Sequence, residues 1–168
     1  MNDIADVFTQ LTQVQCASCV KLWVDEESSG RDFVTTYCRD RRSRNVRGQQ
    51  DGEDRRSTDR NTASHEVLHS SPYFFSNDLR KETNYHNDRV GWQKYYLSAA
   101  VIAIHGVPLH DDQDNQQYLD TVGFLCIDGK EPNVFRKEET VAFMECIADI
   151  LYLPLHQLRR IKREGGGT

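Results

Sequence analysis

Two uninterrupted apolar runs of strand character in the second half of the chain constrain the fold most strongly. They cover residues 95–104 (YYLSAAVIAI) and 122–128 (VGFLCID). Neither run alternates apolar with polar residues, so both faces of each strand should be covered by other parts of the protein. A long amphipathic helix is predicted from about Glu138 onward. We therefore expect a central sheet with helices on one face and a second layer on the other.

Length and composition are consistent with one domain. The chain has 168 residues, of which 38% are hydrophobic and 28% charged, enough for a sizeable core. Its net charge of -5 argues against a general nucleic-acid or anionic-membrane binder. The first residues contain no basic and apolar leader pattern, and the five cysteines lie mostly in apolar runs. We expect a cytoplasmic protein with reduced thiols, bound to neither nucleic acid nor membrane.

The remaining elements follow from local patterns. Apolar residues at helical spacing predict an opening helix, and Pro154 should kink or interrupt the final one. Neighbouring strands joined by short turns, with helices outside them, favour an α+β fold with a mainly antiparallel sheet. Between the two helices, the patterns predict strands at 16–24, 32–38 and 73–75, a short helix at 62–70, and a polar loop at 79–94.

Residues 39–60 differ from the rest of the chain. They contain eight arginines and five acidic residues, with Val46 as the only aliphatic residue. Such a segment buries too little apolar surface to offset its ordering entropy, so we predict a solvated charged loop. An arginine-bearing lid or partner arm is the alternative. The domain should thus span residues 1–163, with 39–60 as an insertion and 164–168 as a flexible tail.

Taken together, several stretches resemble the GAF domain family of small cytoplasmic sensor modules. The resemblance covers residues 3–156 except the 39–60 insertion. Its strongest parts are the strand VGFLCID at 122–128 and the helix FMECIADILY at 143–152. The other parts are residues 16–23 (CASCVKLW), 61–63 (NTA), 73–79 (YFFSNDL), 85–87 (YHN) and 95–104.

The resemblance implies a six-stranded antiparallel sheet. The terminal helices should pack on one face, and the middle helix and loops should cover a pocket on the other. Members of the family bind cyclic nucleotides, bilins, haem, iron or small metabolites, and many dimerise through the terminal helices. The resemblance thus implies a sensory or regulatory domain rather than an enzyme, with a small-molecule ligand and a homodimer.

The family's known ligands can be compared with individual residues. Bilin attachment commonly uses a cysteine followed by histidine, and no cysteine here precedes a histidine, so a bilin is not expected. Cyclic-nucleotide members often carry an Asn-Lys pair, then Phe and an acidic pair. This chain offers only a partial match in Gly129-Lys130, Phe135 and Glu138-Glu139. These residues therefore do not identify the ligand.

Six residues are candidates for ligand binding. Polar loop residues over an apolar cavity commonly orient a small ligand. Turn chemistry at Asn77 and Asp78 is an equally good interpretation, and Trp92 and Tyr96 also suit a role as core anchors. The candidates are Asn77, Asp78, Tyr85, His86, Trp92 and Tyr96.

Two further motifs suggest metal or redox chemistry. His65-Glu66-Val67-Leu68-His69 fits the HExxH pattern, in which two histidines on one helix face bind zinc and Glu66 acts as general base. The helix is short, however, and no third ligand is recognisable, so a zinc hydrolase using His65 and His69 is a minor alternative. Cys16 and Cys19 form a CxxC, but a regular strand places them on opposite faces.

Two main hypotheses result. The first is a GAF-like sensor that binds a small molecule between the sheet and the middle helix and signals through its terminal helices. The second is a ligand-free interaction module whose pocket is filled by Phe74, Phe75, Trp92 and Tyr96.

Overall fold

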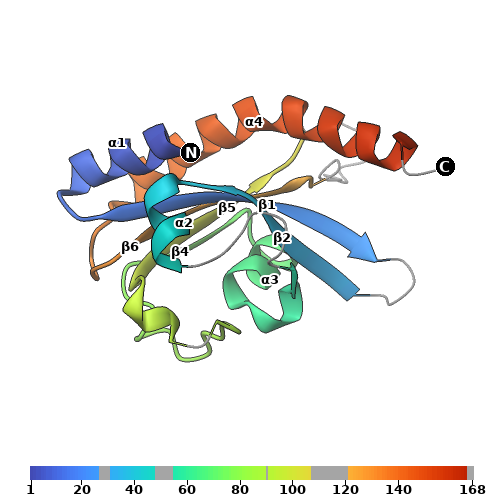
Figure 1. The fold of residues 1–168 in the computed structure, drawn as a ribbon. Helices are drawn as coiled ribbons and strands as arrows, with labels where there is room; N and C mark the ends of the chain where they lie inside the picture. Colours follow the sequence, from blue (N-terminus) through green and yellow to red (C-terminus); the bar gives the residue numbers. More distant parts are fainter. Residues whose placement is uncertain (27–30, 48–54, 90, 107–120, 166–168) are drawn as a thin grey trace, which may run out of the picture.

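The computed structural model describes residues 1–26, 31–47, 55–89, 91–106 and 121–165 (Figure 1). One sheet lies between two layers of helices. The elements in chain order are α1 (Asn2–Thr12), β1 (Cys16–Glu26), β2 (Arg31–Arg39), α2 (Arg41–Arg47), β3 (Arg55–Ser57), the 3-10 helix η1 (Thr58–Arg60), α3 (Thr62–His69), β4 (Tyr73–Ser76), the 3-10 helix η2 (Trp92–Lys94), β5 (Ser98–Ile104), β6 (Gly123–Gly129) and α4 (Lys137–Gly165).

The described strands form a six-stranded sheet in the order β3-β2-β1-β6-β5-β4. All of its neighbouring pairs are antiparallel, so the predicted α+β fold with about six strands is confirmed. The two long apolar runs become the adjacent strands β5 and β6. Strand β5 begins at Ser98 rather than Tyr95, because the N–H groups of Tyr95 and Tyr96 both donate to the carbonyl of Trp92 in a helical turn.

One face of the sheet packs against α1 and α4. In β5, the side chains of Ala100, Ile102 and Ile104 point to this face and are almost fully buried. They share a core with Phe8 of α1 and with Met144 of α4. Figure 1 shows both terminal helices along the same side of the sheet, as predicted.

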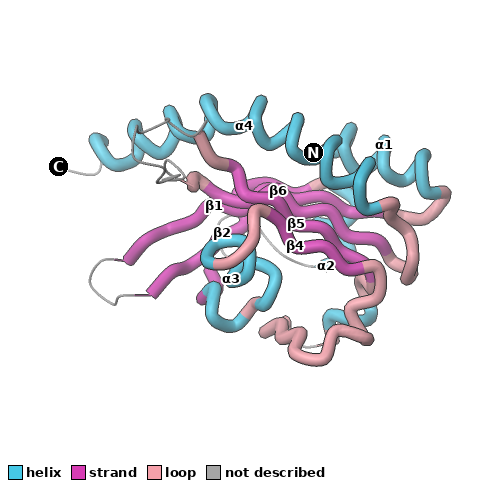
Figure 2. The backbone as a smooth tube through the Cα atoms, turned by 180° about the vertical axis from the view of Figure 1, so that it is seen from behind, coloured by secondary structure: helices cyan, strands magenta, loops and turns pink. Residues whose placement is uncertain are grey.

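The opposite face packs against α3 and the loop that leads to β5. The alternate residues of β5, Ala99, Val101 and Ala103, point to this face. They form a second core with Ala63 and Val67 of α3. Figure 2 shows α3 on the side of the sheet away from α1 and α4. Both faces of the apolar strands are therefore covered, which explains why these strands lack polar alternation.

Helix α3 begins where its sequence predicts. The side-chain oxygen of Asn61 accepts a hydrogen bond from the backbone N–H of Ser64 at 3.0 Å, which is the expected geometry of an N-cap. Thr62 adds a link to the following loop, since its N–H donates to the carbonyl of His86 at 3.0 Å. The cap and this link hold the start of α3 against the loop.

The prediction of a charged loop over residues 39–60 is wrong for most of this segment. Arg39 ends β2, residues 41–47 form α2, and residues 55–60 form β3 and η1. Buried polar contacts replace the missing apolar burial: the Asp40 carboxylate accepts hydrogen bonds from the N–H groups of Ser18 at 3.0 Å and Ser43 at 2.9 Å. Residues 48–54, which the prediction also covered, lie outside the described residues.

The C-terminal helix is longer than predicted. It continues through Pro154 and includes residues 164 and 165, which were expected in a flexible tail; residues 166–168 lie outside the described residues. Pro154 has no N–H to donate to the carbonyl of Ile150, and both residues are exposed, on the side of the helix away from the core. By length and composition alone, Lys137–Ile161 could cross a membrane. Its Met144, Ala148 and Leu155 are buried on the sheet, which accounts for part of this apolar character.

Candidate functional site

A cavity lies between the sheet and the layer formed by α3 and the 77–97 loop. Its volume is about 70 Å³, and it is lined from the sheet side by β1, β2, β3, β5 and β6. Asn61, Ala63 and Ser64 line it from the start of α3, and Tyr85, Asn87 and Arg89 from the loop. This is the face on which the sequence predicts a pocket. A drug-sized ligand typically needs about 300–1,000 Å³, so the space in this conformation suits a much smaller group.

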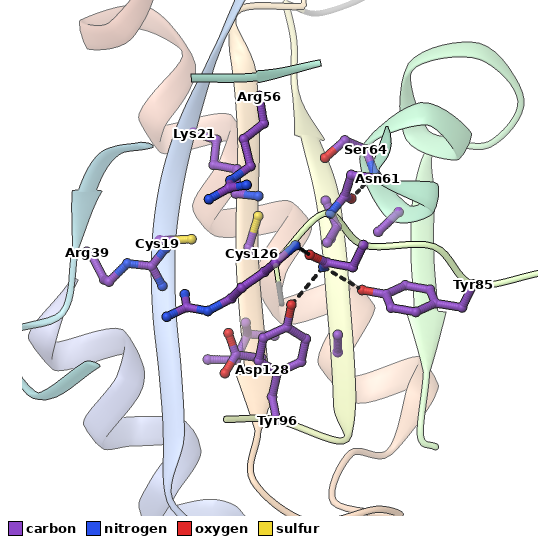
Figure 3. Close-up of a pocket in the computed structure, with 16 residues that line it drawn as sticks. Cys19, Lys21, Arg39, Arg56, Asn61, Ser64, Tyr85, Tyr96, Cys126 and Asp128 are labelled. Atoms are coloured by element: carbon purple, nitrogen blue, oxygen red, sulfur yellow. Dashed lines mark hydrogen bonds between the residues drawn. The ribbon is translucent and has the colours of Figure 1, made fainter. Parts of the chain in front are cut away.

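The walls of the cavity are strongly cationic. Lys21, Arg39, Arg56 and Arg89 line it, together with the single carboxylate of Asp128 (Figure 3). The whole chain carries a net charge of -5, so this concentration of positive charge runs against the overall balance. A concave site lined by charges of one sign attracts ligands of the opposite sign.

Arg39 is the most unusual of these cations. Arg39 is only 6% exposed, and the Nε and Nη1 atoms of its side chain have no hydrogen-bond partner in the protein. Buried charged donors are normally paired, because an unpaired buried charge is strongly destabilising. Figure 3 shows its guanidinium group directed from the edge of the cavity toward β1. The site therefore offers two nitrogen donors that lack an acceptor.

Strand register explains how Arg39 reaches the cavity. Arg39 is the Cα partner of Cys19 in β1, and Cys19 is in turn the Cα partner of Cys126 in β6. Directly paired residues of neighbouring strands point to the same face. Cys16 faces the α1 and α4 side instead, as the odd spacing in the CxxC predicts. The CxxC is therefore not a thiol pair, whereas Cys19 and Cys126 are neighbours on the cavity face.

The loop side of the cavity is organised by Asn87. Its Nδ2 donates to the hydroxyl oxygens of Tyr85 at 3.2 Å and Tyr96 at 2.8 Å. Its Oδ1 accepts from the backbone N–H of Arg89 at 2.9 Å. Burial raises the pKa of Tyr85 above its usual value, while the hydrogen bond with Asn87 opposes this shift. The side-chain amide of Asn87 thus positions the hydroxyl groups of Tyr85 and Tyr96 and the backbone at Arg89.

Of the six candidates from the sequence, Tyr85 and Tyr96 line the cavity. Trp92 packs between them, with ring centroids 5.1 Å from Tyr85 and 5.7 Å from Tyr96, and contributes no lining surface. Trp92 is therefore an aromatic anchor behind the tyrosines, the alternative that the sequence left open.

The other three candidates lie away from the cavity lining. Asn77 Nδ2 donates to the carbonyl of Phe135 at 2.7 Å, and its Oδ1 accepts from the Phe135 N–H at 3.0 Å. Asp78 binds the Arg80 guanidinium at 2.8 and 2.9 Å, which lowers the pKa of this carboxyl. His86 is exposed and lies 3.4 Å from Asp88. Asp78 therefore has the local role that its turn chemistry suggested, whereas Asn77 joins two segments that are distant in the sequence.

The partial cyclic-nucleotide pattern is not assembled at the cavity either. Phe135 is buried in the core on the opposite face of the sheet, beside Phe8. Glu138 and Glu139 lie in the first turn of α4, and none of these three residues lines the cavity. The pattern gives no support to a cyclic nucleotide at this site.

The HExxH residues also lie outside the cavity. His65 and His69 contact each other through their rings, with centroids 4.6 Å apart. Each approaches a different carboxylate, Asp59 at 3.7 Å from His65 and Asp32 at 3.8 Å from His69. Within the described residues, no group of three or more histidine, cysteine or acidic side chains could hold a metal ion. The geometry gives no support to a zinc hydrolase.

The aromatic filling proposed for a ligand-free pocket is present only in part. Phe74, Trp92 and Tyr96 belong to the core on the cavity side, where Tyr85 joins them. Phe75 points to the other face and packs against the core beneath α1 and α4. The aromatic residues therefore reduce the pocket without closing it.

Sequence reasoning missed the cationic residues that define the cavity. Arg39 and Arg56 lie in the segment predicted as a solvated loop, and Lys21 lies in a strand whose opposite face is apolar. The hairpin register alone would not have found Arg39: an irregularity between Val20 and Lys21 shifts the pairing of β1 with β2 by one residue and places this arginine beside Cys19. Arginines at the start of a charged run can continue a strand if they face a polar cavity.

Comparison with known proteins supports the fold and leaves the ligand open. No protein-family model matches the chain, and no curated protein matches it. Among solved structures, the GAF domain of an Acinetobacter phosphoenolpyruvate-protein phosphotransferase is similar, with 10% identity, a TM-score of 0.62, and coverage of 96% of this chain and 83% of that one. The described chain thus has a GAF-like fold.

Two other neighbours show how varied proteins of this shape are. A type II free methionine-R-sulfoxide reductase from Thermoplasma acidophilum shares 13% identity, with a TM-score of 0.59 and coverage of 94% of this chain and 90% of that one. A far-red cyanobacteriochrome photoreceptor shares 10% identity, with a TM-score of 0.56 and coverage of 94% and 84%. A sensor and an enzyme share the fold, so function must be argued from the site.

Proposed function

We propose that this GAF-like domain is a sensory module that binds a small oxyanion, a phosphate or carboxylate group, in the cavity beneath α3. The observation that carries the proposal is the buried guanidinium of Arg39, two of whose nitrogens have no partner in the protein. Arginine presents its donors in a planar fork that matches the oxygens of such groups. Both atoms are covered from solvent in this conformation, so an oxyanion would supply the missing acceptors after the guanidinium turns toward the cavity.

The surrounding charges support an anion rather than a neutral ligand. Lys21, Arg56 and Arg89 line the same cavity and add to the positive potential there. Asp128 is the opposing charge, and it gives the site an acceptor for a hydroxyl or amino group on the same ligand. A small hydroxy acid or phosphorylated metabolite fragment would use both features.

The cavity volume of about 70 Å³ limits the size of the group that enters it. This space holds a few water molecules or one compact anion, given that a water occupies about 30 Å³ in the liquid. A larger ligand would place its charged group here and leave the rest of the molecule outside. The size therefore favours an anionic headgroup over an enclosed tetrapyrrole.

We propose that the output surface is formed by α1 and α4, through a dimer of this chain. Apolar side chains are exposed along these helices, and Ile150 and Leu153 of α4 are 75% and 60% exposed. Phe143, Cys146, Ile150 and Leu153 follow one another at spacings of three and four residues, the spacing of a helix–helix seam. A dimer would cover this seam.

Anion binding is tested by titration of the purified chain with inorganic phosphate and with acetate, at ionic strength held constant with chloride. We expect saturable binding and a higher melting temperature with at least one of them. Arg39→Met should weaken binding by about 10-fold or more, since hydrogen bonds to charged groups contribute about 1.5–3 kcal/mol. Arg42→Met is the matched control, because Arg42 is exposed and pairs with Asp6 away from the cavity.

Three outcomes would overturn the proposal. The first is the absence of saturable binding for phosphate, acetate and small phosphorylated or carboxylated compounds. The second is equal binding by wild type and Arg39→Met. The third is equal weakening by Arg39→Met and Arg42→Met, which would indicate a general charge effect. The first outcome would favour the ligand-free interaction module, whose aromatic residues already fill part of the pocket.

The dimer is tested by sedimentation of wild type and Ile150→Glu across a range of concentrations. A carboxylate in an apolar seam should shift the equilibrium to monomer, because a charge there loses its solvation. Gln93→Glu adds the same charge on the opposite layer, where residue 93 is exposed in η2, and should leave association unchanged. A wild-type chain that is monomeric at all concentrations would remove the dimer from the proposal.

A further inference from the structure

Two cysteines that the anion proposal does not use lie side by side in the cavity. Cys19 of β1 and Cys126 of β6 are Cα partners, and both line the cavity. They are 3% and 8% exposed, so the cavity is their route to small molecules. Figure 3 shows both sulfur atoms on the cavity side of the sheet.

The strand register sets their spacing. The N–H of Trp23 donates to the carbonyl of Val122, and the N–H of Lys130 donates to the carbonyl of Gln15. Hydrogen-bonded pairs therefore fall at odd-numbered positions of β1, which include Cys19. Cα atoms in such a pair lie about 5.5 Å apart, and disulfides typically join Cα atoms about 4.4–6.8 Å apart. The Cα separation permits a bridge in this register, and closing it requires the two Cβ atoms to approach by about 1 Å, because opposed residues lie about 4.5–5.5 Å apart at Cβ and disulfides about 3.5–4.5 Å.

The surroundings favour one thiolate in the pair. A hydrogen bond with Cys126 lowers the pKa of Cys19, burial raises it, and the positive charges of Arg39 and Lys21 lower it further, with a net shift downward. The same interaction and burial raise the pKa of Cys126, which keeps its proton. A thiolate beside a protonated thiol, with a guanidinium nearby, is the arrangement of a nucleophile and its resolving partner.

We propose that Cys19 and Cys126 form a redox-active dithiol that reacts with a small hydroperoxide and closes to a reversible disulfide within the cavity. The Cys19 thiolate attacks one peroxide oxygen, the O–O bond breaks, and the other oxygen takes up a proton and leaves as water or an alcohol. Cys19 becomes a sulfenic acid. The sulfur of Cys126 then attacks the Cys19 sulfur, and the hydroxyl group leaves as water with the Cys126 proton.

The step balances as a two-electron exchange. Together the two thiols lose two protons and two electrons, and the two oxygens of the broken peroxide bond gain them. A small dithiol reductant returns the pair to the reduced state by thiol–disulfide exchange. The cavity volume of about 70 Å³ admits hydrogen peroxide, which is why the oxidant class is a hydroperoxide.

The other cysteines do not share this arrangement. Cys16 and Cys38 are in the core on the α1 and α4 side of the sheet, and Cys146 is exposed on α4. Dithiol oxidation is a function beyond anion binding, because it forms a covalent bond and needs no bound anion. Arg39 contributes to both, so peroxide and anion should compete for the same space.

The test uses Cys146→Ser protein in phosphate-free buffer, treated with hydrogen peroxide, digested without reduction and mapped by mass spectrometry. We expect a Cys19–Cys126 disulfide as the first oxidation product, and its disappearance after dithiol treatment. Adding Cys126→Ser should leave a sulfenic acid on Cys19 that a dimedone probe traps. Adding Cys38→Ser instead is the control and should leave the disulfide unchanged.

Rates provide a second measurement. Arg39→Met should slow thiol oxidation at about pH 5 by up to about 10-fold, because below the Cys19 pKa of about 6 a rise of one pKa unit lowers the thiolate population about tenfold. Oxidation that starts at Cys16 or Cys38, or the absence of a Cys19–Cys126 disulfide in folded protein, would overturn the inference. The disulfide is measured in the absence of phosphate. A failure of the anion-binding experiment would therefore not affect the outcome of the disulfide experiment. A circular dichroism spectrum confirms folding of each variant.

Discussion

The side-chain amide of Asn77 forms a two-way hydrogen-bond pair with the backbone of Phe135, donating to its carbonyl at 2.7 Å and accepting from its N–H at 3.0 Å. The two residues are 58 positions apart in sequence. This pair joins the end of β4 to the segment that enters α4. It links the layer on the cavity side with the helix on the other side of the sheet.

Asn77→Ala should therefore lower stability without acting on the cavity directly. Loss of the amide leaves the N–H and carbonyl of Phe135 unpaired in a partly buried place, at a cost of about 1–3 kcal/mol. Urea unfolding measures the change. Lys81→Ala is the control, because its ammonium group is exposed and 3.8 Å from Asp78, a pair worth about 0–1 kcal/mol. Equal stabilities of Asn77→Ala and wild type would show that the pair is not structural.

Arg39→Met should have the opposite effect on the free protein. In anion-free buffer, the substitution removes a buried charge with two unpaired nitrogens and keeps most of the side-chain volume. We expect the free energy of unfolding to rise by about 1–3 kcal/mol, the scale of an unsatisfied buried polar group. Urea unfolding in chloride and in phosphate measures the change. A destabilised Arg39→Met protein would mean that the guanidinium is already satisfied within the fold.

Gly123→Ala should destabilise the centre of the sheet. A Cβ atom at this position would overlap the backbone oxygen of Lys21 and lie 3.1 Å from the Cα of Leu22. Backbone atoms of a central strand cannot move aside easily, so we expect a loss of about 1–3 kcal/mol or more. Thermal unfolding measures this. The control is Gly91→Asn, since Gly91 has a φ of 68° that asparagine tolerates, and a Cβ there would make only ordinary van der Waals contact with the Lys94 side chain, at 3.7 Å.

Cys16 should make stability fall with rising pH in the alkaline range. Burial raises the pKa of Cys16 from 9.0 to about 11, so between these values the unfolded chain loses a proton that the folded chain keeps. Fewer protons on the unfolded state mean that stability decreases from pH 9 toward pH 11, by about 1–2 kcal/mol once solvent screening of the thiol is included. The difference between wild type and Cys16→Ala across this range isolates the effect. In the exposed Cys146→Ala control, the pH dependence of wild type should be retained.

The sequence predicted the sheet and its two covering layers well, because continuous apolar strands and amphipathic helices carry that information locally. The apolar runs at 95–104 and 122–128 predicted strands covered on both faces, although the first strand begins only at Ser98, and Asn61 is an N-cap by residue type and position. The site was predicted less well, because it depends on pairing between distant segments. Tyr85 and Tyr96 were found as loop-borne aromatics, but Asn77 and Asp78 have turn chemistry that mimics ligand chemistry.

Arg39 shows why composition misled the prediction. A run rich in arginine resembles a solvated loop, yet buried hydrogen bonds to Asp40 order the chain directly after it. Such compensation depends on partners from β1, which no local window contains. Cys19 and Cys126 are 107 residues apart, so their proximity also depends on strand pairing alone.

In the proposed sensory role, the alternation of side chains along β1 would shorten the path of a signal from the cavity to the terminal helices. Cys19 faces the cavity, and its direct neighbour Val20 is 1% exposed in the core beneath α1 and α4. Leu125 and Cys126 have the same relationship in β6. Any movement of the peptide unit that follows a ligand or a new sulfur–sulfur bond on one face displaces a packed side chain on the other. The cavity and the terminal helices are therefore separated by the thickness of a single strand, and no relay through loops is required.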